Sequence, residues 1–213
     1  MFRSLLFIPG NNERFLQKSI KLHADILCFD LEDSVPSSEK EAARNLVASF
    51  LTTKQGGNDS LIYVRINSFD SGLVDGDLGR VVMKGLDGIV LPKIGNSEEV
   101  TQIIQKIDVI VSKRKLSSDI QIIPSIETSR GVVNANSIAS SHKNVTALVF
   151  GVFDYLYDMN IDVEYDDFMS YNYARSKIPV DAKAAGIDAF DGIWQNVKDI
   201  DGLIKDAVIA KKL

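Results

Sequence analysis

Short apolar runs alternate with longer segments of helical periodicity along nearly the whole chain. We expect strands over residues 3–8, 25–31, 61–66, 87–91, 120–126, 145–151 and 188–192. We expect helices over residues 11–22, 37–52, 76–84, 97–113, 129–140, 168–185 and 200–212. Runs of four to eight apolar residues are typical of strands buried in a parallel sheet. Their regular alternation with helices favours a TIM-type (β/α)8 barrel over an open doubly wound sheet.

The predicted strands are one fewer than a (β/α)8 barrel requires. Residues 203–213 keep a helical pattern, and nothing strand-like follows them. A barrel without its eighth strand would expose two unpaired strand edges. We therefore expect residues 1–213 to form a single (β/α) barrel domain that is incomplete at its C-terminus. The alternatives are that a neighbouring subunit or the N-terminal segment covers the gap.

Composition excludes several classes of function. The 213 residues are 45% hydrophobic and 25% charged, which is ordinary for a globular domain. A net charge of −5 without a dominant Lys/Arg cluster argues against nucleic-acid binding. Cys28 is the only cysteine, so no disulfide framework exists and a cytoplasmic location is favoured. No apolar run is long enough to span a membrane, and no glycine-rich dinucleotide-binding motif follows the first strand.

Acidic residues directly follow three of the apolar runs. Asp30, Glu32 and Asp33 end the second predicted strand, Glu127 ends the fifth and Asp154 follows the sixth. In barrel enzymes, the chemistry lies at this rim, where the carboxyl ends of the strands meet. Carboxylates gathered there repel one another, and a bound cation would hold them together. Glu127 and Asp154, with water and a bidentate ligand, suit Mg²⁺; alternatively, each only caps the helix behind it.

Cationic residues end two predicted strands at the same rim, and a third opens the first strand. Arg65 could bind a substrate carboxylate or stabilise an enolate, or it could balance the acidic residues through salt bridges. Lys93 could form a Schiff base if its pKa were lowered, but the nearby acids favour an ion-pair role. Arg3 could contact a ligand or cap local structure. No Ser/His/Asp or Cys/His arrangement is evident, so hydrolysis by a protein nucleophile is not expected.

The acidic residues after the second strand alternate along the chain. If the strand geometry continued through them, Asp30 and Glu32 would point to one face and Asp33 to the other. One of these residues would orient Arg65 or bind a metal-bound water, and another would only cap the next helix.

Six ordered motifs resemble those of one protein family. They are Arg3-Ser4-Leu5-Leu6-Phe7-Ile8-Pro9-Gly10, Asp30-Leu31-Glu32-Asp33-Ser34-Val35, Lys40 with Ala43-Arg44, Val64-Arg65-Ile66-Asn67, Gly88-Ile89-Val90-Leu91-Pro92-Lys93 and Ile126-Glu127-Thr128. Over essentially its whole length, the chain resembles the citrate lyase beta-subunit-like proteins of the HpcH/HpaI aldolase superfamily. That group includes malyl-CoA and citramalyl-CoA lyases.

The resemblance implies a barrel of the phosphoenolpyruvate/pyruvate-like type, with Mg²⁺ held by Glu127 and Asp154. It also implies catalytic and substrate-binding side chains at the same rim. The expected catalytic residues are Arg65, Asp33 and Glu32, and the expected substrate-binding residues are Arg65, Arg3, Asp30 and Lys93. Which residue removes the substrate's hydroxyl proton is left open.

The implied reaction is Mg²⁺-dependent cleavage or formation of a carbon–carbon bond. Its substrate is a 3-hydroxy-acyl thioester such as malyl-, citramalyl- or citryl-CoA, and its products are a 2-oxo acid and an acyl thioester. The alternatives are a CoA-independent aldolase acting on free hydroxy-oxo acids and a non-catalytic barrel paralogue. A homo-oligomer, trimeric or hexameric as in similar proteins, is also expected.

The chain departs from the family pattern in two places. Phe153 stands where relatives often have an acidic residue, and Tyr155 stands where they have leucine. Relatives also continue into a Gly-Phe-x-Gly-Lys…Ile-His-Pro segment that forms strand eight.

Overall fold

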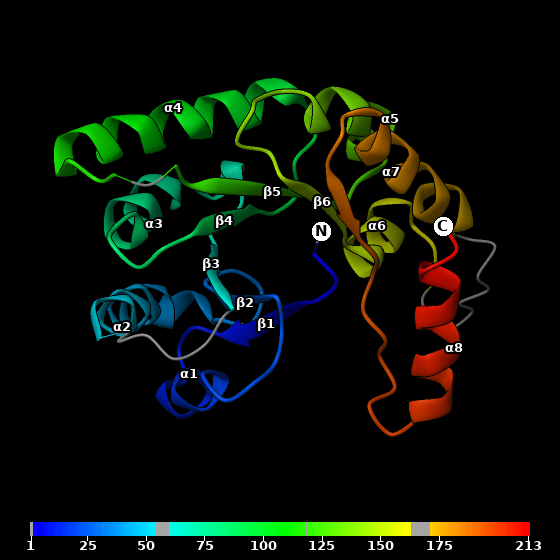
Figure 1. Cartoon of the computed structure of the whole chain (residues 1–213), viewed down its shortest axis with the longest axis horizontal. Helices are drawn as coiled ribbons and strands as arrows, with labels where there is room; N and C mark the ends of the chain where they lie inside the picture. The colour runs from blue at the N-terminus through cyan, green and yellow to red at the C-terminus, as the bar shows by residue number, and fades with distance from the viewer. Residues whose placement is uncertain (1, 54–59, 118, 163–170) are drawn as a thin grey trace.

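A parallel sheet forms the centre of the molecule (Figure 1). The structure is a computed structural model that describes residues 2–53, 60–117, 119–162 and 171–213. Its strands are β1 (Leu5–Pro9), β2 (Ile26–Asp30), β3 (Leu61–Arg65), β4 (Gly88–Leu91), β5 (Gln121–Ile126), β6 (Ala147–Phe150) and β7 (Asp188–Phe190). Each pairs in parallel with the next along the chain. All seven predicted strands are confirmed, and the described residues contain no eighth.

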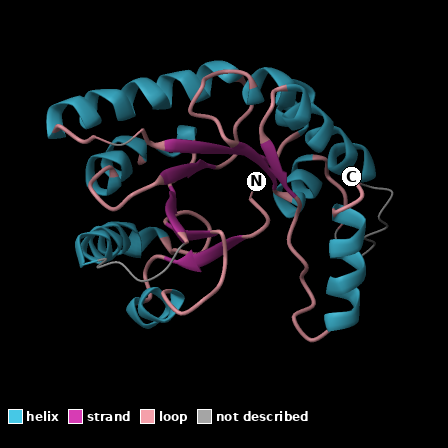
Figure 2. Cartoon of the chain, in the orientation of Figure 1, coloured by secondary structure: helices cyan, strands magenta, loops and turns pink. Residues whose placement is uncertain are grey.

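The helices pack around the curled sheet, except the last, which stands apart from it (Figure 2). They are α1 (Glu13–Ser19), α2 (Lys40–Thr53), α3 (Val74–Val81), α4 (Ser97–Arg114), α5 (Ser129–Ala139), α6 (Val152–Asp158), α7 (Asn172–Ala184) and α8 (Ile200–Ala210), with single 3-10 turns η1 (Ser37–Glu39) and η2 (Phe69–Ser71). The sequence prediction missed α6, a seven-residue helix that begins two residues after the end of β6. Residues 168–170 of the predicted helix 168–185 lie outside the described residues. No described helix has the length and apolar character needed to cross a bilayer.

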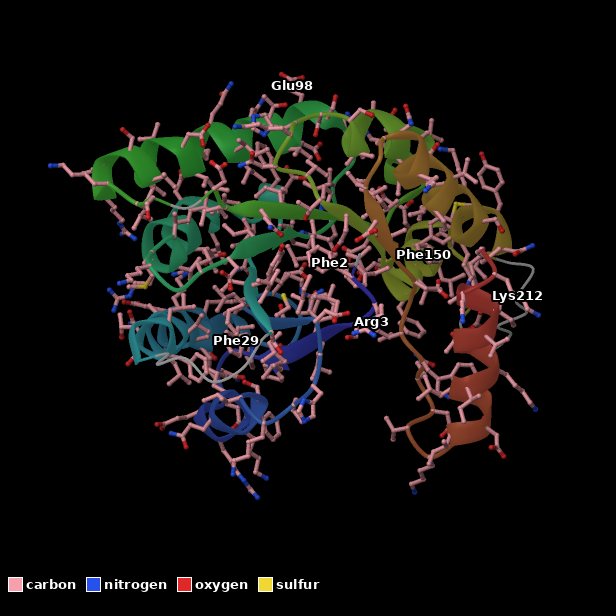
Figure 3. The ribbon with its side chains drawn as sticks, in the orientation of Figure 1. Phe2, Arg3, Phe29, Glu98, Phe150 and Lys212 are labelled. Carbon is pink, nitrogen blue, oxygen red and sulfur yellow. The ribbon has the colours of Figure 1, made fainter. Side chains whose placement is uncertain are left out.

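Asn96 caps the amino end of α4. The Asn96 side chain accepts a hydrogen bond from the Glu99 backbone N–H at 3.0 Å, and the Glu99 carboxylate accepts one from the Gly95 N–H at 2.8 Å. These bonds satisfy N–H groups that have no partner within the helix. Glu98, in the same first turn, points away from the sheet into solvent (Figure 3).

Alternate residues of each strand face two different cores. The inner set fills the curled sheet and consists of Ile26, Cys28, Tyr63, Val90, Ile123, Ala147, Val149 and Phe190. The outer set packs beneath the helices and includes Leu27, Phe29, Val64, Ile89, Ile122 and Leu148. Side chains alternate with a period of two, so Asp30 and Arg65 fall on the inner side at the ends of β2 and β3. They are direct neighbours in the β2–β3 register.

The segment before β1 contacts the last strand. The Phe2 N–H donates a hydrogen bond to Asp188 Oδ2 at 2.7 Å, and the Phe2 ring stacks on Phe190 with 6.2 Å between centroids. Figures 1 and 3 show this end of the chain beside β6 and β7. Within the described residues, β1 and β7 share no ladder, so the sheet is a curled half-barrel.

Gly88 allows β4 to pass close to the buried Tyr63 ring. A Cβ atom at this position would lie 2.3 Å from that ring. We expect Gly88→Ala to lower the free energy of unfolding in urea by about 1–3 kcal/mol, because overpacking a filled core forces strain. Gly79→Ala in α3 is the matched control, since nothing lies within 4 Å of its added Cβ. The control should be neutral or more stable by about 0.5–1 kcal/mol. Equal stability of the two variants would contradict this packing.

Candidate active site

Seven charged side chains gather where the strands end. They come from the ends of β2, β3 and β5, from the turns after β2 and β4, and from the first turn of α6: Asp30, Glu32, Asp33, Arg65, Lys93, Glu127 and Asp154. The structure therefore brings together all the candidate residues named from the sequence except Arg3. We call this set the acidic cluster, because five of its members are carboxylates.

Arg65 is anchored by a bidentate ion pair with Asp30. Its Nε and Nη2 donate to Asp30 Oδ1 and Oδ2, both at 2.7 Å. Its Nη1 lies 3.2 Å from Glu32 Oε2 and 3.3 Å from Asp33 Oδ2, and its guanidinium stacks over the Phe7 ring at 4.9 Å. Burial acts to raise the pKa of Asp30, but the hydrogen bonds and charge of Arg65 outweigh it and hold that pKa below its usual value. The predicted salt-bridge role of Arg65 is confirmed.

Asp33 lies on the same side as Glu32, so the expectation that it points to the opposite face is wrong. Both carboxylates contact Arg65 Nη1 and Lys93 Nζ. The reason is local: β2 ends at Asp30, and the chain then turns. The Asp30 carboxylate stabilises this turn by accepting hydrogen bonds from the N–H groups of Glu32 and Ser34. The period-two alternation of a strand does not apply beyond it.

Lys93 connects two halves of the acidic cluster. One half consists of Asp30, Glu32, Asp33 and Arg65, and the other of Glu127 and Asp154. Its Nζ lies 2.7 Å from Glu32 Oε1, 3.2 Å from Asp33 Oδ1 and 3.5 Å from Asp154 Oδ1. Its backbone N–H donates to Glu127 Oε2 at 2.9 Å, from a left-handed conformation with φ of 54°. Burial acts to lower the pKa of Lys93, but the contact with Glu32 outweighs it and raises that pKa. A Schiff-base lysine requires the opposite shift, so this geometry favours the ion-pair role.

Glu127 is buried against the backbone of Gly151. A Cβ atom at position 151 would lie 2.3 Å from Glu127 Cγ, so only glycine leaves room for this carboxylate. Burial, and then the negative charge of Asp154, raise the pKa of Glu127 to about 7. Asp154 is half-buried, with its side chain 37% exposed. The two carboxylates are thus close enough to repel each other, with Glu127 buried and Asp154 partly exposed.

The residues of this site fit a divalent cation. Five carboxylates face two cationic side chains, which leaves three negative charges when every group is ionised. Glu32 Oε2 is buried and has no hydrogen-bond donor, only the ion pair with Arg65. Among the described residues, no group of three or more His, Cys, Asp or Glu side chains is arranged around one metal position. Carboxylate oxygens are nevertheless the ligands that Mg²⁺ prefers, and a magnesium ion usually keeps several waters.

Arg3 lies away from the acidic cluster. It precedes β1, at the amino ends of the strands, whereas the cluster lies at their carboxyl ends. Its Nη2 is 3.2 Å from Asp25 Oδ1, and its side chain is 82% exposed. The N–H groups of Arg3 and Ser4 also donate to Asp25 Oδ2. The structure therefore does not bring Arg3 to the predicted substrate site.

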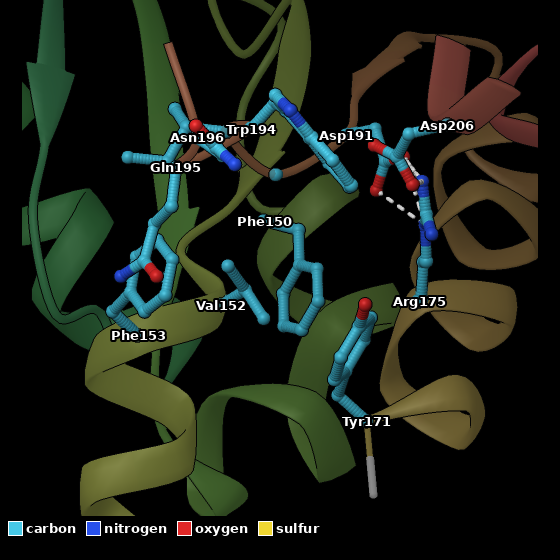
Figure 4. Close-up of a pocket in the computed structure, with 12 residues that line it drawn as sticks. Phe150, Val152, Phe153, Tyr171, Arg175, Asp191, Trp194, Gln195, Asn196 and Asp206 are labelled. Carbon is cyan, nitrogen blue, oxygen red and sulfur yellow. Dashed lines mark hydrogen bonds and ion pairs between the residues drawn. The ribbon is translucent and has the colours of Figure 1, made fainter. Parts of the chain in front are cut away.

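The sequence prediction did not identify two further features. Lys40 Nζ donates to the carbonyl oxygens of Leu31 and Glu32 beneath the acidic cluster; Lys40 was named from the sequence only as part of a family motif. A separate cavity of about 210 Å³ lies between α6, α7, α8 and the loop after β7 (Figure 4). Its lining includes the rings of Phe150, Tyr171 and Trp194 and the ion pairs of Arg175 with Asp191 and Asp206.

Comparison with known proteins gives the family. The family described as "HpcH/HpaI aldolase/citrate lyase" matches residues 3–213 of the chain. The chain belongs to this family. Citrate lyase subunit beta of Leuconostoc mesenteroides subsp. cremoris is 32% identical over 99% of the chain and 70% of that relative. The mitochondrial citramalyl-CoA lyase of Rattus norvegicus is 31% identical over 96% of the chain, which spans 63% of that relative's length.

The fold of this HpcH/HpaI family member matches a solved structure. Protein CitE from Mycobacterium tuberculosis, in complex with magnesium and acetoacetate, superposes with a TM-score of 0.78 at 25% identity. The match covers 97% of this chain and 79% of that one.

The raised pKa of Glu127 predicts a change of stability with pH. The folded protein holds this proton up to about pH 7, whereas the unfolded chain releases it near 4.5. Ionisation of Glu127 therefore destabilises the fold progressively as the pH rises through that interval. Glu127→Gln keeps a hydrogen-bond acceptor but cannot ionise. Between about pH 5 and 8 it should gain about 1–3 kcal/mol relative to wild type, measured by urea denaturation of metal-free protein.

Glu98→Gln is the control, because it removes one carboxylate from an exposed turn of α4. The difference in the free energy of unfolding between Glu98→Gln and the wild type should be the same at about pH 5 and pH 8. If Glu127→Gln behaved in the same way, Glu127 would not be a buried carboxyl group with a raised pKa.

Proposed function

We propose that this chain is a Mg²⁺-dependent carbon–carbon lyase acting on a 3-hydroxy-acyl thioester such as malyl-, citramalyl- or citryl-CoA. The observation that supports it best is the placement of a buried and a half-buried carboxylate, Glu127 and Asp154, near the anchored guanidinium of Arg65. The names of the relatives support the same class of reaction, since they include a citrate lyase subunit and a citramalyl-CoA lyase. The complex of CitE with magnesium and acetoacetate supports a metal together with an oxo-acid ligand.

In this proposal, the two halves of the acidic cluster bind the metal and the substrate. Glu127 and Asp154 would hold Mg²⁺, which when bound supplies a Lewis acid for the carboxylate and hydroxyl oxygens of the substrate. Arg65 Nη1 faces the same space, where its longer contacts with Glu32 and Asp33 can be exchanged for a substrate oxygen. Asp30 keeps the guanidinium in place, and Lys93 adds positive charge beside the substrate.

Glu32 is our choice for the group that accepts the hydroxyl proton. Burial raises its pKa to about 7, even though the contacts with Lys93 and Arg65 act against that change. A base with this pKa can take up and return a proton at neutral pH. The pKa of Asp33 is lowered: burial opposes the shift, but the hydrogen bond with Glu32 and the charges of Arg65 and Lys93 outweigh it. Asp33 therefore serves as the ionised partner of Glu32.

The reaction then balances without water or a redox partner. Glu32 takes the proton of the substrate hydroxyl, and that oxygen becomes the carbonyl of the 2-oxo acid. The bond between the carbinol carbon and the carbon next to the thioester breaks, and its electron pair forms the thioester enolate. Arg65 and Lys93 offset the negative charge that develops nearby. Return of that proton from Glu32 to the enolate carbon gives the acyl thioester.

Removal of either proposed metal ligand should abolish cleavage. We expect Glu127→Gln and Asp154→Asn to lower kcat/KM by about 100-fold or more, because both the metal and the substrate lose their anchor. Glu98→Gln should stay within about 2-fold of wild type, as a surface change far from the rim. The assay follows the 2-oxo acid as its phenylhydrazone, with malyl-, citramalyl- and citryl-CoA as substrates. EDTA should stop the reaction, and added Mg²⁺ should restore it.

Other outcomes of this assay would select the alternatives. Cleavage of free hydroxy-oxo acids, with none of the thioesters, would indicate a CoA-independent aldolase. Binding of Mg²⁺ and a 2-oxo acid without any cleavage would indicate a non-catalytic paralogue. If Glu127→Gln and Asp154→Asn kept the activity of the wild type, the proposed metal site would be wrong. A trimeric or hexameric assembly and a cytoplasmic location stay predictions.

A further inference from the structure

Lys40, the first residue of α2, binds the turn that contains the catalytic acids. Its Nζ donates to the carbonyl oxygens of Leu31 and Glu32, both at 2.7 Å. These carbonyls lie beyond the end of β2, and the Glu32 carbonyl also accepts a hydrogen bond from the Val35 N–H at 3.0 Å. The ammonium group also places a positive charge behind Asp30, Glu32 and Asp33. One side chain thus satisfies two backbone acceptors and offsets part of the repulsion among these carboxylates.

Arg44 lies one turn further along α2 and reaches the segment after Arg65. Its Nε donates to Asp77 Oδ1 of α3 at 2.5 Å. Asp77 is fully buried, and its Oδ2 accepts from the N–H and the Nδ2 of Asn67 at 2.8 and 2.7 Å. Asn67 is two residues beyond Arg65.

The two cations face the same side of α2, since residues four apart lie above one another on a helix. We propose that Lys40 and Arg44 are positioning residues: Lys40 fixes the turn with Glu32 and Asp33, and Arg44, through Asp77, fixes the segment after Arg65. The catalytic meaning of this inference rests on the proposed lyase function. Neither residue contacts substrate; they act through the groups that do.

Lys40 and Arg44 support only one half of the acidic cluster. The proposed metal ligands Glu127 and Asp154 belong to β5 and α6, and the contacts of Lys40 and Arg44 lie with β2, β3 and α3. Loss of either cation should therefore disturb catalysis while leaving the metal site intact. A general loss of folding would disturb both.

Hydrogen exchange tests the positioning without any assay of activity. Lys40→Met should accelerate amide exchange about 10-fold in residues 32–35, and Arg44→Met should do so in residues 66–68, since each loses the contact that orders its own segment. Each variant should leave the other segment unchanged. Lys113→Met, on an exposed turn of α4, is the matched control and should change neither. Unchanged exchange, or equal acceleration everywhere, would overturn the inference. If Lys40→Met does not fold, Lys40→Gln replaces it.

Kinetic measurements test whether the positioning by Lys40 and Arg44 contributes to catalysis. Lys40→Met and Arg44→Met should lower kcat about 10–100-fold, while the affinity for Mn²⁺, measured by electron paramagnetic resonance, stays within about 3-fold of wild type. Arg44→Lys, which keeps a donor for Asp77, should recover part of the loss. Faster exchange with unchanged kcat would overturn the catalytic role. A wild type that cleaves no tested substrate would refute the proposed function, whereas the exchange experiment would still decide the positioning.

Discussion

The ion pair between Arg65 and Asp30 is the interaction on which the rest of the site depends. The two residues are neighbours in the β2–β3 register, and both point into the barrel where their strands end. A guanidinium at this depth requires an anionic partner, because an unpaired buried charge is strongly destabilising. The bidentate contact uses two nitrogens of Arg65 and turns the third towards Glu32 and Asp33. One pair of residues thus sets the orientation of the whole acidic side of the rim.

The carboxylates crowded around this pair fall into two groups, one with lowered and one with raised pKa values. Asp30 and Asp33 have lowered pKa values, because their contacts with cations and neighbouring hydrogen bonds outweigh burial. Glu32 and Glu127 have pKa values raised to about 7, because burial dominates there. A site that must both bind charge and transfer a proton needs both kinds of group. The same strand-end geometry supplies them without a histidine.

The sequence predicted most of the fold, because short apolar runs mark the strands of a parallel sheet directly. It also placed six of the seven clustered charges at one rim by their position after those runs, while Asp33 was expected on the wrong face. That error and the expectation for Arg3 share a cause: a linear pattern does not show where a strand begins or ends in space. Arg3 precedes β1 and so lies at the opposite edge. Lys40 was missed as a site residue because its partners are backbone carbonyls, which leave no signal in side-chain identity.

Lys93 explains how the two halves of the site act as one. Its left-handed backbone directs the N–H to Glu127, on the proposed metal side, while its Nζ reaches Glu32 and Asp33 on the proton-transfer side. Non-glycine residues seldom adopt this conformation, which persists only where surrounding contacts stabilise it. Here the stabilising contacts are those same carboxylates. Gly151 completes the arrangement from the other side, since its missing side chain is the space that Glu127 occupies. Two small backbone features therefore fix the distance between the proposed metal ligands and the proposed base, and neither would be recognised from the charged residues alone.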